Sequence, residues 1–436
     1  MLCLKQPDKR HRVQPRALPA SRSSGVQSPS KPRSLAKFKP RAPKAVRSSP
    51  AQKSKTPPFL PPLEPSIWKP VPVAQEEVDQ ALLVDGGSPL ELRQIAEKVW
   101  AGQSACFTRR WKDLLEVRKA LNVVATEHLA SLQDAAEAHR ERRRLLRNCA
   151  RRLFAEVSSS GELQPAGGPP LGYVPVLYED AAKLYFRAND ITALNVAWQF
   201  FLNGLEYSFL PNKLHPFFGV YFTLSPVEHF QLLRDWLEKL KPANSWHVLD
   251  LGTGCGVITF ILRSMYSDMT VTASDLCPNA VFSVRAELQR WGVQGVKVVQ
   301  SDLFAKLEEE GPFDLIIFNP PWVPRAPEVQ PSAGDVVFGN DYPADLFDRL
   351  FAEAPAALRP GGHLAILFSN YAESRGLVSQ SPLKACEKAA DQLELLEVHE
   401  RNVPVKDRSR HRQTRRDKAW AFKQDHRVEL WHFVRR

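Results

Sequence analysis

The sequence predicts an α/β protein whose C-terminal half folds as a doubly wound parallel sheet. In that half, apolar runs of four to six residues alternate with helix-length segments, and strands separated by helices form parallel sheets covered on both faces. A glycine-rich sequence directly follows the first of these strands. The rest of the chain is expected to form a mainly helical accessory domain and a disordered basic tail.

The predicted tail, residues 1–62, carries the surplus positive charge of the protein. The 436-residue chain has 59 Lys+Arg, 48 Asp+Glu and a net charge of +11, and residues 1–62 alone hold fifteen Lys/Arg and one acid. With twelve Pro and two aromatic residues, this stretch cannot bury enough apolar surface to offset the entropy of ordering. Its composition fits a transit peptide, a basic arm for nucleic acid or a nuclear signal, or an inert extension.

Composition places the rest of the chain among soluble globular proteins. Hydrophobic residues make up 43% and charged residues 25% of the chain, and no apolar run reaches the roughly 18 residues of a membrane helix. Six scattered Cys without a C-x-x-C pair argue against a structural metal or a disulfide framework. We therefore expect no membrane partner and a reducing intracellular compartment: a plastid or mitochondrion if the tail is a transit peptide, otherwise cytoplasm or nucleus.

Residues 66–210 show helical patterns and are predicted to form the accessory domain. Ser88-Pro89-Leu90-Glu91 is a capping box with proline at the first helical position. A long helical pattern covers 108–154, and two shorter ones cover 181–186 and 192–204. Residues 139–152 carry seven Arg, which is typical of a solvated helix face or of contacts to a phosphate backbone.

The C-terminal half, residues 215–436, contains the alternating elements. Strands are expected at 248–249, 271–273, 296–299, 315–318 and 364–368, and helices at 257–265, 278–291, 344–358 and 382–393. Residues 393–403 and 428–433 have no helix between them and predict a terminal antiparallel hairpin. Residues 406–418, with seven bases and two acids, are expected to form a basic loop that either is solvated or contacts phosphates.

The glycine motif, W-H-V-L-D-L-G-T-G-C-G-V at 246–257, is the strongest signal in the sequence. A strand ends at Asp250, and glycines let the chain turn and let a ligand approach the free N–H groups of the next helix. The spacing is G-x-G-x-G rather than the G-x-G-x-x-G of dinucleotide sites. A carboxylate beside the loop repels a pyrophosphate but suits an amino group, which favours S-adenosylmethionine over NAD. The expected cofactor-binding residues of this motif are Asp250, Gly252, Thr253, Gly254 and Gly256.

Two further acids end the next two predicted strands. Asp275 is placed to accept hydrogen bonds from ribose hydroxyls, and Asp302 from an adenine amino group, while Leu303 is placed to contact the adenine ring. Because open α/β sheets bind ligands at the carboxyl ends of their strands, three acids at three consecutive strand ends predict a nucleoside site.

The fourth predicted strand ends in Asn319-Pro320-Pro321-Trp322. Two prolines cannot continue a parallel strand, so the chain leaves the sheet rigidly. The Asn319 side-chain oxygen and the Pro320 carbonyl can then accept hydrogen bonds from one NH₂ group, and Trp322 offers a flat face to a planar substrate. These four residues are the predicted catalytic residues, and no metal is expected to be needed.

Together these motifs resemble the class I S-adenosylmethionine-dependent methyltransferases of the small methyltransferase domain group. The group includes ribosomal-RNA guanine N2-methyltransferases and release-factor glutamine N5-methyltransferases. The resemblance covers about residues 215–436 and implies a seven-stranded, Rossmann-like sheet with an antiparallel last strand. Residues 215–230, 319–324 and 367–377 are also similar to bacterial enzymes in which the segment before the glycine motif closes over the ligands. That similarity implies pocket positions for Tyr221, Thr223 and His215.

The predicted function is S-adenosylmethionine-dependent methylation of an amino or amide nitrogen. A nucleic-acid base, above all in ribosomal RNA, is the first expected acceptor, because of the two basic clusters and Trp322. A protein glutamine is the alternative, since its amide satisfies the same acceptors, and a small molecule is the third. Two hypotheses of other classes are a non-catalytic RNA-binding module that kept the fold, and a nicotinamide dehydrogenase, which the glycine spacing disfavours.

Overall fold

The computed structural model describes residues 57–130, 135–179, 183–325, 341–404 and 426–436, which lie in one compact unit, Lys55–Arg436. Most of the predicted tail and the whole of the predicted basic loop at 406–418 lie outside the described residues. None of the helices in the described ranges is long and apolar enough to cross a membrane.

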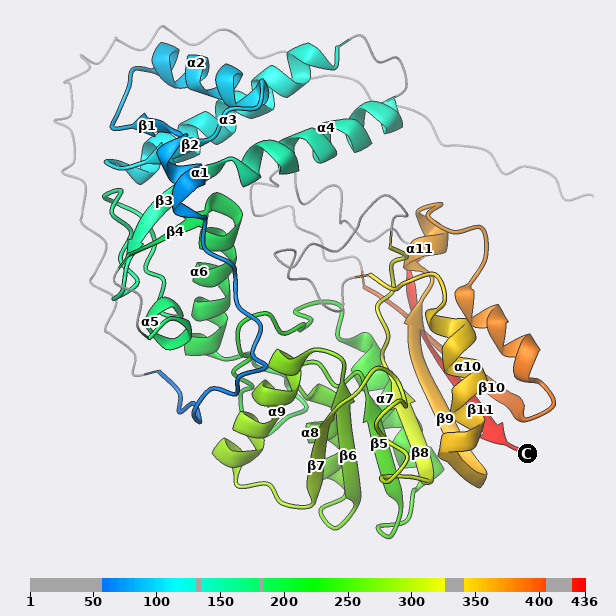
Figure 1. Ribbon diagram of the computed structural model, residues 1–436. Coiled ribbons are helices and arrows are strands. Elements are labelled where there is room, and N and C mark those ends of the chain that lie inside the picture. The colour runs from blue at the N-terminus through cyan, green and yellow to red at the C-terminus, as the bar shows by residue number, and fades with distance from the viewer. Residues whose placement is uncertain (1–56, 131–134, 180–182, 326–340, 405–425) are drawn as a thin grey trace, which may run out of the picture. The chain divides into compact units, whose positions relative to one another are not determined.

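A seven-stranded sheet forms the C-terminal half, in the order β10-β11-β9-β8-β5-β6-β7. The five strands from β9 to β7 are parallel, whereas β11 is antiparallel to both β9 and β10. This arrangement confirms the predicted doubly wound fold and the terminal hairpin (Figure 1). The strands are β5 (His247–Leu251), β6 (Thr270–Asp275), β7 (Val296–Gln300), β8 (Phe313–Phe318), β9 (Leu358–Ser369), β10 (Leu393–Asn402) and β11 (Arg427–Arg435).

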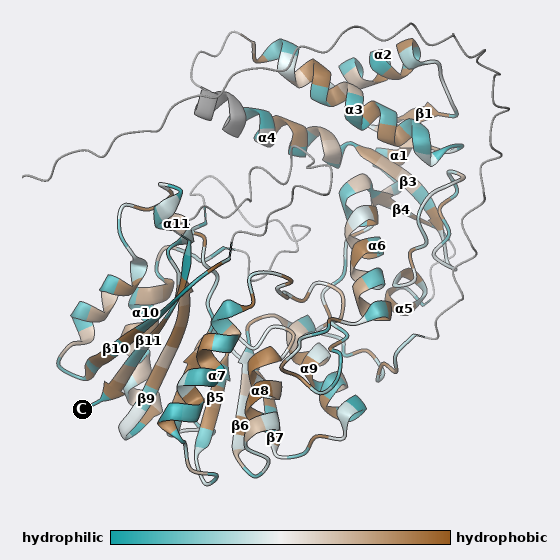
Figure 2. Ribbon diagram, turned by 180° about the vertical axis from the view of Figure 1, so that it is seen from behind, coloured by the Kyte–Doolittle hydropathy of each residue, from teal (hydrophilic) through white to brown (hydrophobic). Residues whose placement is uncertain are grey.

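Helices cover both faces of this sheet because alternate side chains of its strands point to opposite faces. On one face Val248 packs in the cluster that contains α7 (Glu228–Leu240), α8 (Val257–Met265) and α9 (Pro278–Trp291). On the other face Leu249 packs with α10 (Leu346–Ala357) and a 3₁₀ helix over Pro382–Ala389. Figure 1 shows α10 in front of the sheet, and Figure 2, from behind, shows α7 and α8. The predicted helix at 278–291 matches α9.

The N-terminal part is mainly helical, as predicted, but it also contains a four-stranded sheet that the sequence analysis did not predict. Its strands follow the order β1-β2-β3-β4, with only the last pair antiparallel. The helices are α1 (Gln75–Asp79), α2 (Pro89–Trp100), α3 (Trp111–His128), α4 (Ala135–Arg151), α5 (Val174–Leu177) and α6 (Ala188–Asn203), and the strands are β1 (Leu82–Val84), β2 (Ala105–Phe107), β3 (Leu153–Ser158) and β4 (Lys183–Arg187).

Two local predictions in this part have different outcomes. The capping box is confirmed, because Ser88 Oγ accepts from the Glu91 N–H and the Glu91 carboxylate accepts from the Ser88 N–H. The helix predicted at 181–186 is wrong, since its described residues belong to β4, which pairs with β3 and buries Phe186. A short apolar run has too few residues for its periodicity to separate a helix from a strand.

An extended segment before α1 lies against the catalytic half. Residues 57–62, which the sequence analysis placed in the tail, belong to this segment, and the Phe59 carbonyl accepts from Arg290 Nη1 at 2.6 Å. The fully buried Asn279, on α9, makes three hydrogen bonds: its Oδ1 accepts from the Trp68 N–H at 2.7 Å, and its Nδ2 donates to the Trp68 and Phe218 carbonyls at 2.9 and 2.7 Å. One amide side chain therefore joins three segments that are far apart in the sequence.

We expect Asn279→Ala to lower the free energy of unfolding by about 2–3 kcal/mol, because it leaves buried backbone groups without partners. Chemical denaturation measures this loss. Asn195→Ala, which removes a single hydrogen bond at the surface of α6, is the control and should change stability by less than about 0.5 kcal/mol. Equal effects of the two substitutions would contradict the assigned role of Asn279.

Candidate active site

The register of the central strands brings the predicted site residues to one edge of the sheet. Leu251, at the end of β5, pairs with Ser274 on β6 and with Phe318 at the end of β8. Asp275 pairs with Gln300, the last residue of β7. The glycine loop, Asp275, Asp302 and Asn319 therefore all follow neighbouring strand ends, where α/β sheets bind ligands.

Asp250 is a fully buried carboxylate at the centre of this edge. Its Oδ2 accepts three hydrogen bonds, from Thr253 Oγ1 at 2.7 Å, from the Thr259 N–H at 2.9 Å and from Thr259 Oγ1 at 2.6 Å. Its Oδ1 is buried and has no partner among the described residues. Burial raises the pKa of Asp250 to about 6 against the lowering effect of these donors. At neutral pH the group is therefore a buried anion with one oxygen free for a cation.

Thr259 is a residue that the sequence analysis missed. It lies in the first turn of α8, inside the otherwise apolar run V-I-T-F-I-L, and it is fully buried. A buried hydroxyl in such a run needs a polar partner. Its position nine residues after Asp250 could therefore have indicated a hydrogen bond to that carboxylate.

The three loop glycines adopt positive φ, with values of 66° at Gly252, 54° at Gly254 and 87° at Gly256. All three also face close neighbours, and a Cβ on Gly256 would lie 3.0 Å from the Phe260 ring. A Cβ on Gly252 would lie 2.9 Å from the Phe318 ring, and one on Gly254 would lie 3.2 Å from the Tyr221 carbonyl oxygen. The loop fits between β8 and the segment that contains Tyr221 because Gly252 and Gly254 have no side chains that would collide with them.

Asp275 holds the loop as well as ending β6. Its Oδ2 accepts from the Gly254 N–H at 2.8 Å, and its Oδ1 accepts from the Cys277 N–H at 2.8 Å. Burial raises the pKa of this carboxyl, and the two backbone donors oppose that rise. The structure thus joins Asp275 directly to the glycine motif, as its predicted role in the same site requires.

Asp302 and Leu303 differ in their surroundings. Leu303 is buried beneath the site in the rare left-handed conformation, with φ 46°. The Asp302 side chain is half-exposed and forms an ion pair with Arg349 of α10, at 3.0 Å from its Nη2. Arg349 is a second residue that the sequence analysis missed, since it lies 47 positions along the chain and in no motif.

Asn319 to Trp322 leave the sheet where β8 ends. Asn319 Oδ1 is buried without a partner among the described residues. Trp322 is half-buried, and its Nε1 donates to the Leu367 carbonyl at 3.4 Å. Its ring packs edge-to-face on His229, with centroids 5.0 Å apart. His229 was missed too, although it shares the apolar stripe of α7 with Leu233 and Trp236.

The three residues suggested by the upstream similarity have distinct positions. The Tyr221 carbonyl lies beside Gly254. Thr223 Oγ1 donates to the Pro226 carbonyl at 3.3 Å, and the Thr223 carbonyl accepts from Tyr207 Oη at 2.7 Å. His215 instead contacts α6 and α9. Its ring Nδ1 lies 2.6 Å from the Phe201 carbonyl oxygen, and its backbone N–H donates to the Glu287 carboxylate.

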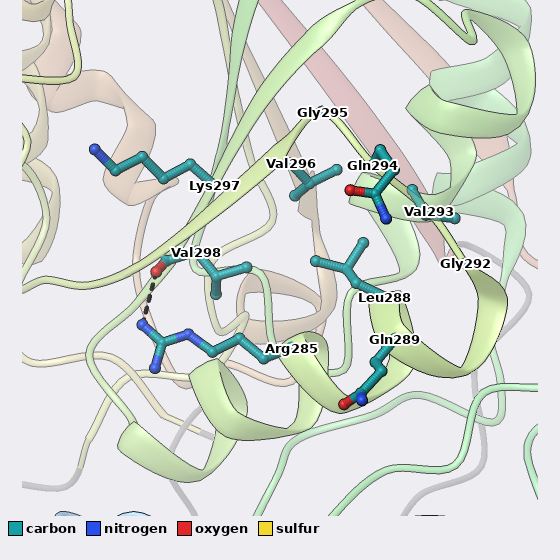
Figure 3. Close-up of a pocket in the computed structure, with 10 residues that line it drawn as sticks. All are labelled: Arg285, Leu288, Gln289, Gly292, Val293, Gln294, Gly295, Val296, Lys297 and Val298. Carbon is teal, nitrogen blue, oxygen red and sulfur yellow. Dashed lines mark hydrogen bonds between the residues drawn. The ribbon is translucent and has the colours of Figure 1, made fainter. Parts of the chain in front are cut away.

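A surface hollow of about 490 Å³ lies elsewhere, between the end of α9 and the start of β7 (Figure 3). Residues 292–298 and the side chains of Arg285, Leu288 and Gln289 line it. Because β7 begins there, the hollow lies at the amino ends of the parallel strands, whereas the glycine loop lies at their carboxyl ends. It contains none of the predicted site residues.

We expect Asp250→Asn to raise stability at neutral pH. Because the folded-state pKa is raised, the fold favours the protonated carboxyl, and the contribution of Asp250 to stability falls as pH rises from about 4 through about 6. The asparagine keeps an oxygen for the three donors without the buried charge. The variant should therefore match the wild type near pH 4 and exceed it by up to about 3 kcal/mol above pH 7. Urea denaturation of both proteins over this pH range measures the difference, and a pH-independent difference would contradict the raised pKa.

Comparison with known proteins agrees with this geometry. Residues 231–394 match the family model "Methyltransferase small domain". Similar curated proteins include the release factor glutamine methyltransferases of Deinococcus radiodurans, 38% identical over 141 residues (31% of this chain, 50% of the relative), and of Koribacter versatilis, 35% identical over 159 residues (34% and 56%). The chain thus spans about half the length of the curated relatives it matches.

Solved structures are more distant. TrmN from Thermus thermophilus is 19% identical, with a TM-score of 0.31 over 47% of this chain and 48% of that one. A ribosomal protein L11 methylase from Lactobacillus delbrueckii is 14% identical, with a TM-score of 0.31 over 51% and 85%. The family model and the curated relatives agree with the resemblance predicted from the sequence: residues 231–394 are similar to a methyltransferase small domain.

Proposed function

We propose that the protein is an S-adenosylmethionine-dependent N-methyltransferase whose acceptor is the side-chain amide of a protein glutamine. One observation carries this proposal. Two buried oxygens without partners among the described residues, Asp250 Oδ1 and Asn319 Oδ1, follow the ends of the adjacent strands β5 and β8. One belongs to an anion and suits an ammonium group, and the other belongs to a neutral amide and suits an N–H donor.

The cofactor half of the site is built from the ends of β5 and β6. S-adenosylmethionine supplies an electrophilic methyl group carried on a sulfonium. Asp250 Oδ1 would accept from the amino group of its methionine part, and the glycine loop would present its backbone to the ligand. Asp275 would accept from the ribose hydroxyls, and Asp302 and Leu303 would flank the adenine.

The acceptor half is built from Asn319 to Trp322. Asn319 Oδ1 and the Pro320 carbonyl would accept the two N–H bonds of the acceptor amide. Hydrogen bonds of this kind favour charge on the nitrogen as it pyramidalises. Since a sulfonium is already a good leaving group, holding donor and acceptor in line supplies most of the rate enhancement.

The relatives support a glutamine acceptor more than the RNA base that the sequence analysis ranked first. Both curated relatives named above are release factor glutamine methyltransferases. In the Arg-rich helix α4, Arg144 is paired with Glu141 and Arg142 donates to Asn122, so part of its charge is already used within the protein. A ribosomal-RNA base is the second candidate, because its exocyclic amine fits the same two acceptors.

We expect Asn319→Ala to lower turnover by about 10²–10³-fold while the dissociation constant for S-adenosylmethionine changes little, since the lost interaction is made with the reacting group. Transfer of tritiated methyl groups to unmethylated release factor gives the rate, and calorimetry gives cofactor affinity. Asn195→Ala, far from the sheet edge, is the control. Unchanged turnover in Asn319→Ala would contradict the assigned role.

The same assay decides the acceptor class. Protein and RNA fractions from cells lacking this protein are incubated with the purified enzyme and tritiated S-adenosylmethionine. The proposal expects label in protein, at the amide of a glutamine. Label confined to RNA, with steep salt dependence of binding, would overturn the glutamine assignment, and absence of cofactor binding would overturn the enzymatic one.

A further inference from the structure

His229 is a buried polar residue that the proposed site does not yet use. It is the second residue of α7 and is 1% exposed. Neither of its ring nitrogens has a hydrogen-bond partner among the described residues. Buried polar groups in native proteins are nearly always paired, and an unpaired one costs about 1–3 kcal/mol. An ordinary core position would be served better by an apolar ring.

The surroundings of His229 are aromatic and belong to the acceptor half of the site. Its ring contacts Phe230 and packs against the Trp322 ring, with centroid distances of 3.9 and 5.0 Å. Trp322 is three residues after Asn319, which carries another unpaired buried oxygen. Unpaired groups of opposite hydrogen-bonding capacity thus meet one short loop, an amide oxygen on Asn319 and a ring that contacts Trp322.

Trp322 is the group that can expose His229 to a ligand. Its polar contact with the sheet is a single long hydrogen bond, 3.4 Å from Nε1 to the Leu367 carbonyl. A bond of this length at the edge of the accepted range is weak. Access of a ligand to the imidazole would require a small shift of this indole.

We propose that His229 binds the acceptor directly, donating a hydrogen bond from its imidazole to the carbonyl oxygen of the amide whose nitrogen Asn319 holds. This inference rests on the proposed function and deepens it. A donor for the carbonyl and an acceptor for the NH₂ match a carboxamide and reject a carboxylate, which has no N–H for Asn319. Asn319 therefore distinguishes glutamine from glutamate, and His229 holds the carbonyl oxygen of the same amide.

The charge state of His229 suits this role. Burial lowers its pKa to about 3, so the ring is neutral at physiological pH. A neutral imidazole keeps one N–H donor and does not add a positive charge beside the cationic cofactor. No described acid or base makes a hydrogen bond or ion pair with the ring.

The test compares His229→Phe, His229→Gln and the wild type. Phenylalanine keeps the aromatic contact with Trp322 and removes both nitrogens, and glutamine restores an N–H donor. His128→Phe, on the exposed end of α3, is the matched control. Three quantities are measured: the unfolding midpoint, the dissociation constant for S-adenosylmethionine, and kcat and KM with unmethylated release factor.

We expect His229→Phe to lower kcat/KM about 100-fold, with cofactor affinity within about twofold of the wild type and an unfolding midpoint that is no lower. His229→Gln should recover about a tenth or more of the lost activity. A structural histidine would behave differently, since its loss would lower the midpoint together with activity.

Two results would overturn the inference while leaving the proposed function intact: wild-type kcat/KM in His229→Phe, or equal losses of midpoint, cofactor affinity and activity in both His229 variants. A wild-type enzyme that binds S-adenosylmethionine but does not methylate release factor or any protein fraction overturns the proposed function itself, and the role assigned to His229 with it.

Discussion

The buried carboxylate of Asp250 is the constraint on which the rest of the site depends. An anion with no exposure to solvent is costly, and here Thr253 and Thr259 donate three hydrogen bonds to a single oxygen. Those donors fix the glycine loop against the start of α8. With the loop fixed, the Gly254 N–H reaches Asp275 and Gly252 lies against Phe318, so the ends of β5, β6 and β8 are held together.

Several buried polar atoms near the same edge of the sheet have no hydrogen-bond partner among the described residues. Asp250 Oδ1, Ser274 Oγ, Asn319 Oδ1 and both nitrogens of His229 are buried without partners among the described residues. Each lowers stability by itself. Proteins retain such groups where a ligand completes their hydrogen bonds, so their concentration around adjacent strand ends supports the proposed ligand position independently of any motif. The hollow between α9 and β7 contains none of these groups.

The sequence predicted the parts of the structure that short-range chemistry determines. Strand ends, the glycine turn and the Pro-Pro exit each depend on a few consecutive residues, and the capping box at Ser88 is of the same kind. The sheet of the N-terminal part escaped prediction because its strands are three to six residues long, too short for a period to be visible. Arg349 and His229 escaped because their roles arise from contacts with distant segments, whereas Thr259 was missed although its partner Asp250 is only nine residues away. The tail was predicted to extend to residue 62, whereas the described structure begins at residue 57. Residues 57–62 also depend on a distant segment, because the Phe59 carbonyl accepts a hydrogen bond from Arg290.

Cofactor and acceptor requirements are carried by different segments of this fold. Asp250, Asp275 and the loop glycines interact mainly with one another, so they can remain constant while the acceptor changes. On the proposed acceptor side, Trp322, which follows β8 together with Asn319, contacts His229 on α7, a helix that packs on β9, β10 and β11 at the other end of the sheet. Substitutions in α7 can therefore alter which nitrogen is accepted without disturbing the cofactor residues. Because the prolines fix the exit of β8, the proposed site would offer the same two acceptors to any NH₂ group, and the proposal leaves discrimination among amides and nucleobases to the residues that contact the loop from α7.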